Sequence, residues 1–169
     1  MAERVSLRDY QRALVERLRS AGTGRTASKL GMQVGAENWL VDLSEAGEVV
    51  PVPAISPVPL TRPWFKGVTS IRGMLYSVID FPAFLGGTAV TVTDQARLLL
   101  IGERFRLGSA LLVDRSLGLH NPEQLKPREG GGQPAPWLRA EYNDVDGRQW
   151  KELDMVQLVR HPDFLGVAA

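Results

Sequence analysis

The sequence predicts an all-β protein, a sandwich or a barrel, with one helix in front of it. From about residue 31 onward, short runs of β-prone residues are broken by turn residues. Many short strands at close spacing are typical of sandwiches and barrels, whereas parallel α/β folds alternate strands with helices. Asp146-Gly147 lies between two of these runs and predicts a β-hairpin, because a type I′ turn needs positive φ.

Residues 6–20 form the one long amphipathic pattern. Ser6 is followed by Asp9 three positions on, which resembles a capping box, and Gly22 suits the end of a helix. The apolar side chains fall on one narrow stripe: Leu7, Tyr10, Leu14 and Leu18. Residues 1–30 carry seven Lys or Arg against three Asp or Glu, a net charge of +4. We expect this helix to pack on the domain or on a partner. A membrane-surface helix is an alternative with only a thin stripe to support it, and a basic nucleic-acid arm is another.

Nine short runs follow and are predicted as strands: 31–34, 38–43, 48–52, 65–71, 74–80, 96–101, 105–113, 137–142 and 148–154. Residues 50–59 contain repeated prolines, each of which lacks the N–H that a β-ladder needs. We therefore expect this segment to run in an extended form along a sheet edge or the surface.

Two short helices and one long loop complete the prediction. One helix is expected directly after Asp80 and another around 153–160. Residues 120–136 hold four prolines and the run Gly130-Gly131-Gly132, so they predict a long surface loop. Residues 22–28 read as a linker after the first helix.

The composition excludes several classes of function. The chain has no cysteine, which rules out disulfides, thiolate metal sites and cysteine nucleophiles, and which fits a reducing compartment such as the cytoplasm. No apolar run approaches the roughly 18 residues that a membrane-spanning helix requires, and the charged N-terminus does not resemble a secretory signal. A formal net charge of +1 gives no electrostatic argument for nucleic-acid binding.

The search for catalytic or metal-binding residues finds no convincing set. His120 and His161 lie next to prolines in expected turns and have no spacing relation to a pair of carboxylates. Asp80, Asp114 and Asp154 each leave an apolar strand, where an aspartate usually caps a helix or forms a turn. We expect no cofactor, no metal and no enzymatic activity.

The segment Lys66–Gly73 is the strongest candidate for recognition. It joins two predicted strands and ends in Arg72-Gly73. An arginine in such a turn presents a rigid fork of donors beside a backbone that a partner can approach closely. The alternative is that Arg72 only pairs with a neighbouring carboxylate.

The residues from Lys66 to Phe81, KGVTSIRGMLYSVIDF, resemble the signature of CheW-type adaptors, which runs roughly K-G-V-x-N-[LI]-R-G-x-[IV]-x-P-[IV]-[VI]-D-L. The resemblance covers residues 30–119. The ending from Trp137 to Val167 resembles the PilI branch of this family, which serves the chemosensory system of type IV pili and twitching motility.

The resemblance implies a pair of five-stranded SH3-like β-barrels over residues 29–169, with residues 1–28 as an added helix and linker. It implies a non-catalytic scaffold that binds the cytoplasmic tip of a chemoreceptor and the regulatory domain of a CheA-type histidine kinase. Such a protein is cytoplasmic and is recruited to membrane receptor arrays without inserting into the membrane.

The partner-binding residues that the motif implies are Glu48, Gly67, Val68, Ser70, Ile71, Arg72 and Gly73. The sequence departs from the family pattern where Ser70 replaces the usual asparagine and where Tyr76-Ser77 replaces a proline-containing pair. Three alternatives stay open: a CheW-type or CheV-like coupling protein for flagellar chemotaxis, an interaction module without a kinase partner, and an uncharacterised enzyme. A receiver domain would identify the CheV type, and none is expected in this sequence.

Overall fold

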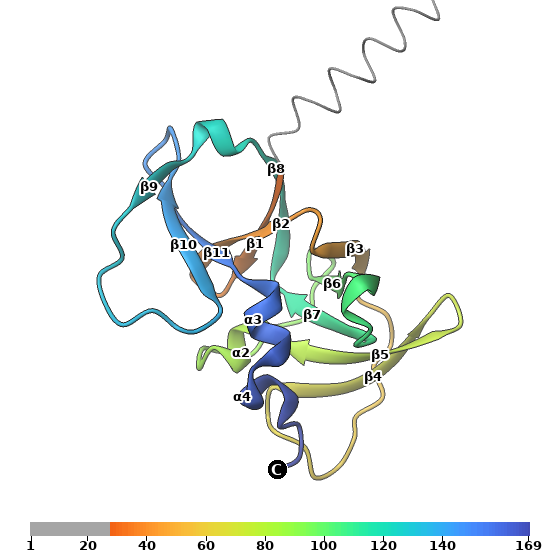
Figure 1. Cartoon of the computed structure of the whole chain (residues 1–169). Helices are drawn as coiled ribbons and strands as arrows, with labels where there is room; N and C mark the ends of the chain where they lie inside the picture. The colour runs from red at the N-terminus through yellow and green to blue at the C-terminus, as the bar shows by residue number, and fades with distance from the viewer. Residues whose placement is uncertain (1–27) are drawn as a thin grey trace, which may run out of the picture.

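Two β-sheets lie side by side in the computed structural model, which describes residues 28–169 (Figure 1). The predicted helix over 6–20 lies outside the described residues. The first sheet contains β1 (Lys29–Val34), β2 (Glu37–Asp42), β8 (Arg115–His120), β9 (Lys126–Arg128), β10 (Leu138–Asn143) and β11 (Gln149–Leu153). The second contains β3 (Ala46–Pro51), β4 (Phe65–Ile71), β5 (Met74–Asp80), β6 (Arg97–Ile101) and β7 (Ser109–Val113).

The chain starts in the first sheet, builds the second sheet, and then returns. The strand orders are β8-β1-β2-β11-β10-β9 and β3-β6-β7-β5-β4. Most neighbours are antiparallel, but β11 pairs with β2, and β7 with β5, in parallel. The parallel pairing of β11 with β2 joins segments more than 100 residues apart, with Lys151 opposite Trp39. The first sheet therefore depends on both ends of the described chain.

All nine predicted strands are present, and two further strands were missed. The run predicted over 105–113 begins later, because Glu103–Phe105 form the 3₁₀ turn η1 and β7 starts at Ser109. β8 contains a glycine and no β-branched residue, and β9 has only three residues, including Pro127. β9 lies within the predicted loop 120–136 and forms an edge of its sheet. The first sheet therefore has six strands rather than five.

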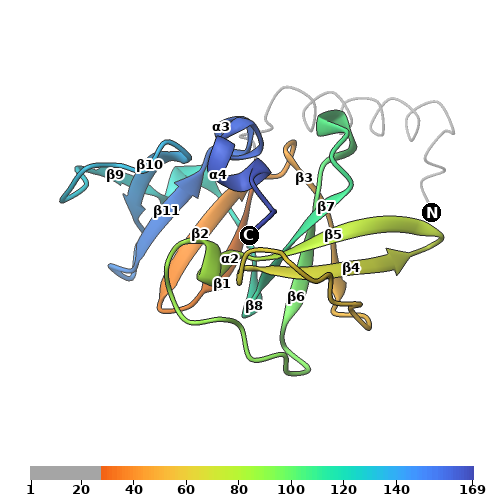
Figure 2. The ribbon, with the colours of Figure 1, turned by 90° about the horizontal axis from the view of Figure 1, so that it is seen from below.

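A shared apolar core fills the space between the two sheets. The first sheet contributes Met32, Trp39 and Val41, and the second contributes residues such as Leu99 and Leu111. The helices α3 (Met155–Arg160) and α4 (Pro162–Leu165) lie over the junction of the sheets and bury Met155, Leu158 and Phe164 (Figures 1 and 2). α2 (Phe81–Phe84) and α3 confirm the two predicted helices, whereas α4 was not predicted. No helix within residues 28–169 is long and apolar enough to cross a membrane.

The proline-rich segment 50–59 follows the sheet edges, as predicted. It leaves β3, which is one edge of the second sheet, and reaches β4, which is the other. Ser56 forms an isolated bridge with Val68, with backbone hydrogen bonds of 2.8 and 2.9 Å. The segment thus supplies hydrogen-bond partners to the edge of β4, although the prolines of the segment prevent it from forming a regular strand.

The Asp146-Gly147 hairpin is confirmed, but the type I′ turn is wrong. Only Gly147 has a positive φ, of 79°, whereas a type I′ turn requires it at both central residues. The Asp144 carboxylate accepts hydrogen bonds from the backbone N–H groups of Asp146 and Arg148, both at 2.9 Å. Gly147 N–H also donates to the Asp144 carbonyl at 3.1 Å. The aspartate side chain therefore supports a longer turn than the dipeptide predicted.

Replacing Gly67 by alanine should destabilise the fold by about 2–4 kcal/mol. Gly67 is buried with φ 131°, and a Cβ there would overlap the Ser56 carbonyl group. Gly131→Ala is the matched control, because a Cβ at Gly131 meets nothing within 4 Å. Urea unfolding measures both, and equal stability of the two variants would contradict the steric role of Gly67.

Candidate partner-binding site

The turn at Arg72-Gly73 closes the β4–β5 hairpin and projects away from the first sheet (Figure 2). Ile71 pairs with Met74, so the turn contains only two residues. Both have positive φ, 50° for Arg72 and 78° for Gly73, as a type I′ turn requires. A left-handed conformation is uncommon for an arginine and costs free energy. The hairpin therefore holds Arg72 in a strained, exposed position.

Arg72 forms an ion pair with Glu48 of β3. An Arg72 guanidinium nitrogen donates a hydrogen bond to Oε1 of Glu48, and both side chains are exposed. This bond holds the pKa of Glu48 below its ordinary value and raises the pKa of Arg72 above its own. The pair connects the hairpin tip to the opposite edge strand of the same sheet. The alternative that Arg72 pairs with a neighbouring carboxylate is thus correct, but the paired Arg72 side chain is still 70% exposed.

The structure separates the seven predicted partner-binding residues into three sets. Ser70, Arg72 and Gly73 are exposed at the hairpin tip, with Glu48 held there by the ion pair. Ile71 is half-buried and packs against an apolar cluster of the second sheet. The other two residues are Gly67 and Val68, which lie where β4 meets the Ser56 bridge.

Sequence reasoning missed two apolar residues at the tip. Met74 and Leu75 are 54% and 67% exposed, and they pair across the hairpin with Ile71 and Ser70. Both were quoted within the motif, but apolar residues in a strand are usually assigned to a buried face. Adjacent strand residues point to opposite faces of a sheet, so two consecutive apolar residues cannot both lie on its buried face. The consecutive pair Met74-Leu75 was therefore the signal in the sequence that a tip extends beyond the core.

Two of the three aspartates that leave apolar strands cap helices, as predicted, whereas Asp114 contacts the distant turn between β1 and β2 instead. Asp80 is fully buried, caps α2 through Ala83 N–H at 3.0 Å and accepts from Val90 N–H at 2.9 Å. Asp154 caps α3 by accepting from Gln157 N–H at 3.1 Å. Asp114 accepts from Gly35 N–H at 2.6 Å. Within residues 28–169, no group of three or more His, Asp or Glu side chains could hold a metal ion.

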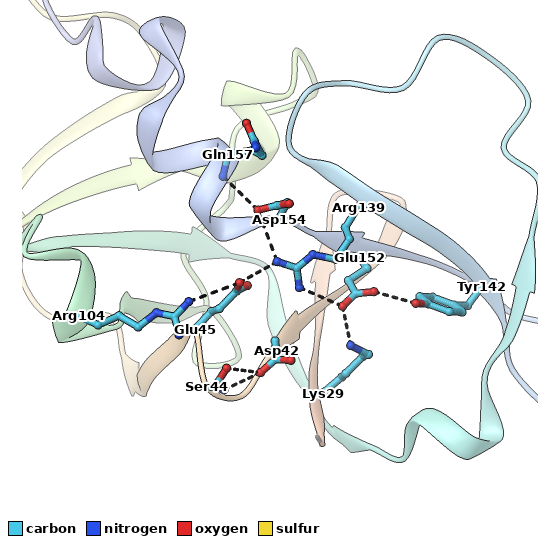
Figure 3. A network of polar contacts seen from close by, with 10 residues as sticks. All are labelled: Lys29, Asp42, Ser44, Glu45, Arg104, Arg139, Tyr142, Glu152, Asp154 and Gln157. Atoms are coloured by element: carbon cyan, nitrogen blue, oxygen red, sulfur yellow. Dashed lines mark hydrogen bonds and ion pairs between the residues drawn. The ribbon is translucent and has the colours of Figure 1, made fainter. Parts of the chain in front are cut away.

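A network of buried charges lies inside and beside the first sheet, and the sequence did not reveal it (Figure 3). Glu152 of β11 pairs with Lys29 at 2.5 Å and accepts from the Tyr142 hydroxyl at 2.8 Å. Arg139 of β10 approaches Glu152 at 3.5 Å and pairs with Glu45 at 2.7 Å. Its members lie as much as 123 residues apart, so no local spacing could have signalled them.

The network changes the pKa values of Tyr142 and Arg139. Burial, followed by the hydrogen bond to Glu152 and its charge, raises the pKa of Tyr142 to about 12. Burial alone would lower the pKa of Arg139, but the hydrogen bond to Glu45 and the charges of Glu45 and Asp154 raise it above its ordinary value. The network therefore disfavours ionisation of the Tyr142 hydroxyl and favours the charged form of Arg139.

A groove of about 940 Å³ lies on the side of the first sheet that carries the glycine-rich loop. Its lining includes Trp39, Trp137 and Gly130–Gly132, together with Lys151, which pairs with Glu37 at 2.6 Å. The Trp137 indole N–H is buried and has no hydrogen-bond partner among residues 28–169.

The fold and the site together define a β-sheet scaffold that works through contact surfaces. The CheW-like domain family matches residues 29–163, and the chain belongs to this family. The chain is 30% identical over 147 residues to Protein PilI of Pseudomonas aeruginosa. The aligned region covers 83% of this chain and 80% of that protein.

The fold also resembles a solved structure. The crystal structure of the scaffolding protein TtCheW from Thermoanaerobacter tengcongensis superposes with a TM-score of 0.62 at 16% identity, over 75% of this chain and 88% of that one. The predicted resemblance to CheW-type proteins, with the PilI branch as a relative, is confirmed.

Tyr142→Phe should remove a phenol that ionises near pH 12. Because the pKa of Tyr142 is raised from about 10 in the unfolded chain to about 12, its contribution to stability is complete below pH 10 and is lost as the pH rises through 12. Ultraviolet titration of phenolate formation measures the pKa of Tyr142, with Tyr76→Phe as the control. The prediction is wrong if Tyr142→Phe removes a group that titrates near pH 10.

Proposed function

We propose that this chain is a non-catalytic adaptor that couples the cytoplasmic tip of a chemoreceptor to the regulatory domain of a CheA-type histidine kinase. Residues 29–169 are the adaptor domain, and residues 1–28 are a separate segment in front of it. The protein works in the cytoplasm and is recruited to membrane receptor arrays. Membership of the CheW-like family supports this assignment, and the structurally similar TtCheW is itself a scaffolding protein.

The observation that carries the proposal is the exposed arginine at the β4–β5 tip. Arg72 is held in a left-handed conformation, pairs with Glu48, and is bordered by exposed Met74 and Leu75. An exposed ion pair contributes little to stability, so the pair does not explain why the strained turn holds an arginine. An arginine beside exposed apolar side chains is the composition typical of an interface hot spot.

We assign the seven motif residues two kinds of role in this interface. Glu48, Ser70, Arg72 and Gly73 contact the partner, with Ile71 packed directly below them. Gly67 and Val68 position the hairpin through the Ser56 bridge. We propose the kinase as the partner of this tip, and a separate face for the receptor.

We further propose that the pathway controls type IV pili and twitching motility. The 30% identity to Protein PilI extends over most of both chains. The region that resembles the PilI branch folds as β10, β11, α3 and α4, so it is an integral part of the first sheet and of the shared core. The likeness is therefore not confined to the general motif of the family.

Arg72→Ala should weaken binding to the isolated regulatory domain of the partner CheA-type kinase by at least about tenfold. Arg106→Ala is the matched control, because Arg106 is also an exposed arginine with a left-handed backbone, at φ 52°, but it lies in the turn after η1. Isothermal titration calorimetry on the full chain measures both, and circular dichroism checks that each variant is folded.

Each outcome of this titration has a separate meaning. If Arg72→Ala binds as tightly as the native chain, the hairpin tip is not the kinase surface. If the native chain does not bind the kinase domain at all, the coupling function is wrong and an interaction module without a kinase partner replaces it.

A further inference from the structure

Two arginines from different sheets converge on one buried carboxylate, that of Glu45. Arg139 belongs to β10 of the first sheet, and Arg104 belongs to η1, between β6 and β7 of the second sheet. Arg139 pairs with Oε1 of Glu45 at 2.7 Å, and Arg104 approaches the same oxygen at 3.7 Å. Figure 3 shows the two guanidinium groups reaching Glu45 from opposite sides. Because they share this oxygen, their nitrogens cannot be further apart than the sum of 2.7 and 3.7 Å, which allows one incoming carboxylate to contact both.

The backbone around each arginine is shaped to bring the two together. The register of β10 against β11 shifts between Leu138 and Ala140, so Arg139 is the additional residue of a β-bulge. A bulge redirects the side chain that it carries. On the other side, Gly102 N–H donates to the Glu45 carbonyl at 3.1 Å, and a Cβ on Gly102 would lie only 2.8 Å from that oxygen. The glycine therefore lets the start of η1 approach the β2–β3 connection closely.

Arg104 is held in position but uses few of its donors. Its guanidinium lies over the Phe105 ring, 4.8 Å from the ring centre, and Phe105 packs against the shared core. The contact of 3.7 Å to Glu45 is too long for a hydrogen bond. The Arg104 side chain is 51% exposed, so its N–H groups face solvent from a defined position. Such preorganised donors lower the entropy cost of binding an acceptor.

The solvent-facing side of this cluster is cationic. The carboxylates that pair with the two arginines are Glu45 and Glu152, which are buried, and Asp154, which is only partly exposed. The arginine side chains are more exposed, at 51% and 34%. A group that arrives from solvent therefore meets guanidinium before carboxylate. Leu43, two residues before Glu45, adds an exposed apolar side chain on the β2–β3 connection. Arginine beside an exposed apolar residue is a composition typical of protein interfaces.

We propose that the Arg104–Arg139 pair binds an acidic side chain at the cytoplasmic tip of the chemoreceptor. The inference rests on the proposed coupling function, which assigns the Arg72 tip to the kinase and a separate face to the receptor. Both sheets contribute to the pair, which meets on the connection where the chain passes from the first sheet to the second, whereas the Arg72 tip belongs to the second sheet alone. A carboxylate is the matching ligand, because a guanidinium fork donates parallel hydrogen bonds to its two oxygens.

Arg104→Ala tests the site without removing the partner that Glu45 depends on, since Arg139 still pairs with Glu45 at 2.7 Å. Arg148→Ala is the matched control, because Arg148 is an exposed arginine in the turn between β10 and β11 and its removal changes the net charge equally. Isothermal titration calorimetry of the full chain with the isolated cytoplasmic hairpin of the receptor measures both. We expect the dissociation constant to rise at least about tenfold for Arg104→Ala and less than about twofold for Arg148→Ala. Circular dichroism checks that each variant is folded.

A charge reversal identifies the chemistry of the contact. Arg104→Glu places a carboxylate where the receptor carboxylate is expected, so it should weaken binding more than Arg104→Ala does. Each acidic residue of the receptor tip is then replaced by lysine in turn. One of these receptor variants should bind Arg104→Glu at least about tenfold more tightly than the native receptor fragment does. If none of them restores binding, the ligand of Arg104 is not an acidic side chain and the proposal is wrong.

The outcomes separate this inference from the proposed function. If the native chain binds the receptor fragment and Arg104→Ala binds it as tightly, or if Arg148→Ala weakens binding equally, this inference alone is overturned. If Arg104→Ala weakens binding to the regulatory domain of the kinase and not to the receptor, the assignment to the receptor is wrong. If the native chain does not bind the receptor fragment at all, the coupling function is overturned, and this inference with it.

Discussion

The apolar layer between the two sheets is the constraint on which the other features depend. The second sheet is one continuous stretch of chain from β3 to β7, but the first sheet is not, because the chain leaves it after β2 and returns to it with β8. The core residues of both sheets, with α3 and α4 packed over their junction, must therefore assemble together. This shared burial fixes the sheets relative to one another and leaves the β4–β5 tip free at the far side (Figure 2).

Charged groups at the border of this layer have ion-pair partners within the protein, although one carboxylate oxygen of Glu45 has no hydrogen-bond partner among residues 28–169. Asp80 caps α2 and also faces Lys66 at 3.7 Å, whereas Glu45 and Glu152 share Arg139. A buried ion pair stabilises little in net terms, but removing one partner leaves an unpaired buried charge and costs several kcal/mol. These groups therefore act to hold one arrangement of the strands, and Arg139 ties the β2–β3 connection to the strands β10 and β11.

The recognition motif combines residues with opposite tasks. Asp80 and Gly67 lie inside the domain, where their roles follow from capping and from the close approach of Ser56. Arg72 lies outside, where its strained backbone and exposed guanidinium contribute to a contact surface rather than to stability. The motif is continuous in the sequence, but the β4–β5 hairpin runs from the core to the tip. Some motif residues therefore lie inside the domain and others on its surface.

Local chemistry was enough to predict nine of the eleven strands, the two helix caps after apolar strands, the edge position of the proline-rich segment, and a hairpin at Asp146-Gly147. Each of these follows from neighbouring residues, through side-chain alternation, a missing N–H or a short hydrogen bond to the backbone. Tertiary structure alone decided the remainder. The Glu152 network joins residues as much as 123 positions apart, β9 forms only because β10 offers an edge, and the exposure of Met74 and Leu75 depends on where the core ends. These features rest on contacts between distant segments, and no spacing within the sequence encodes such contacts.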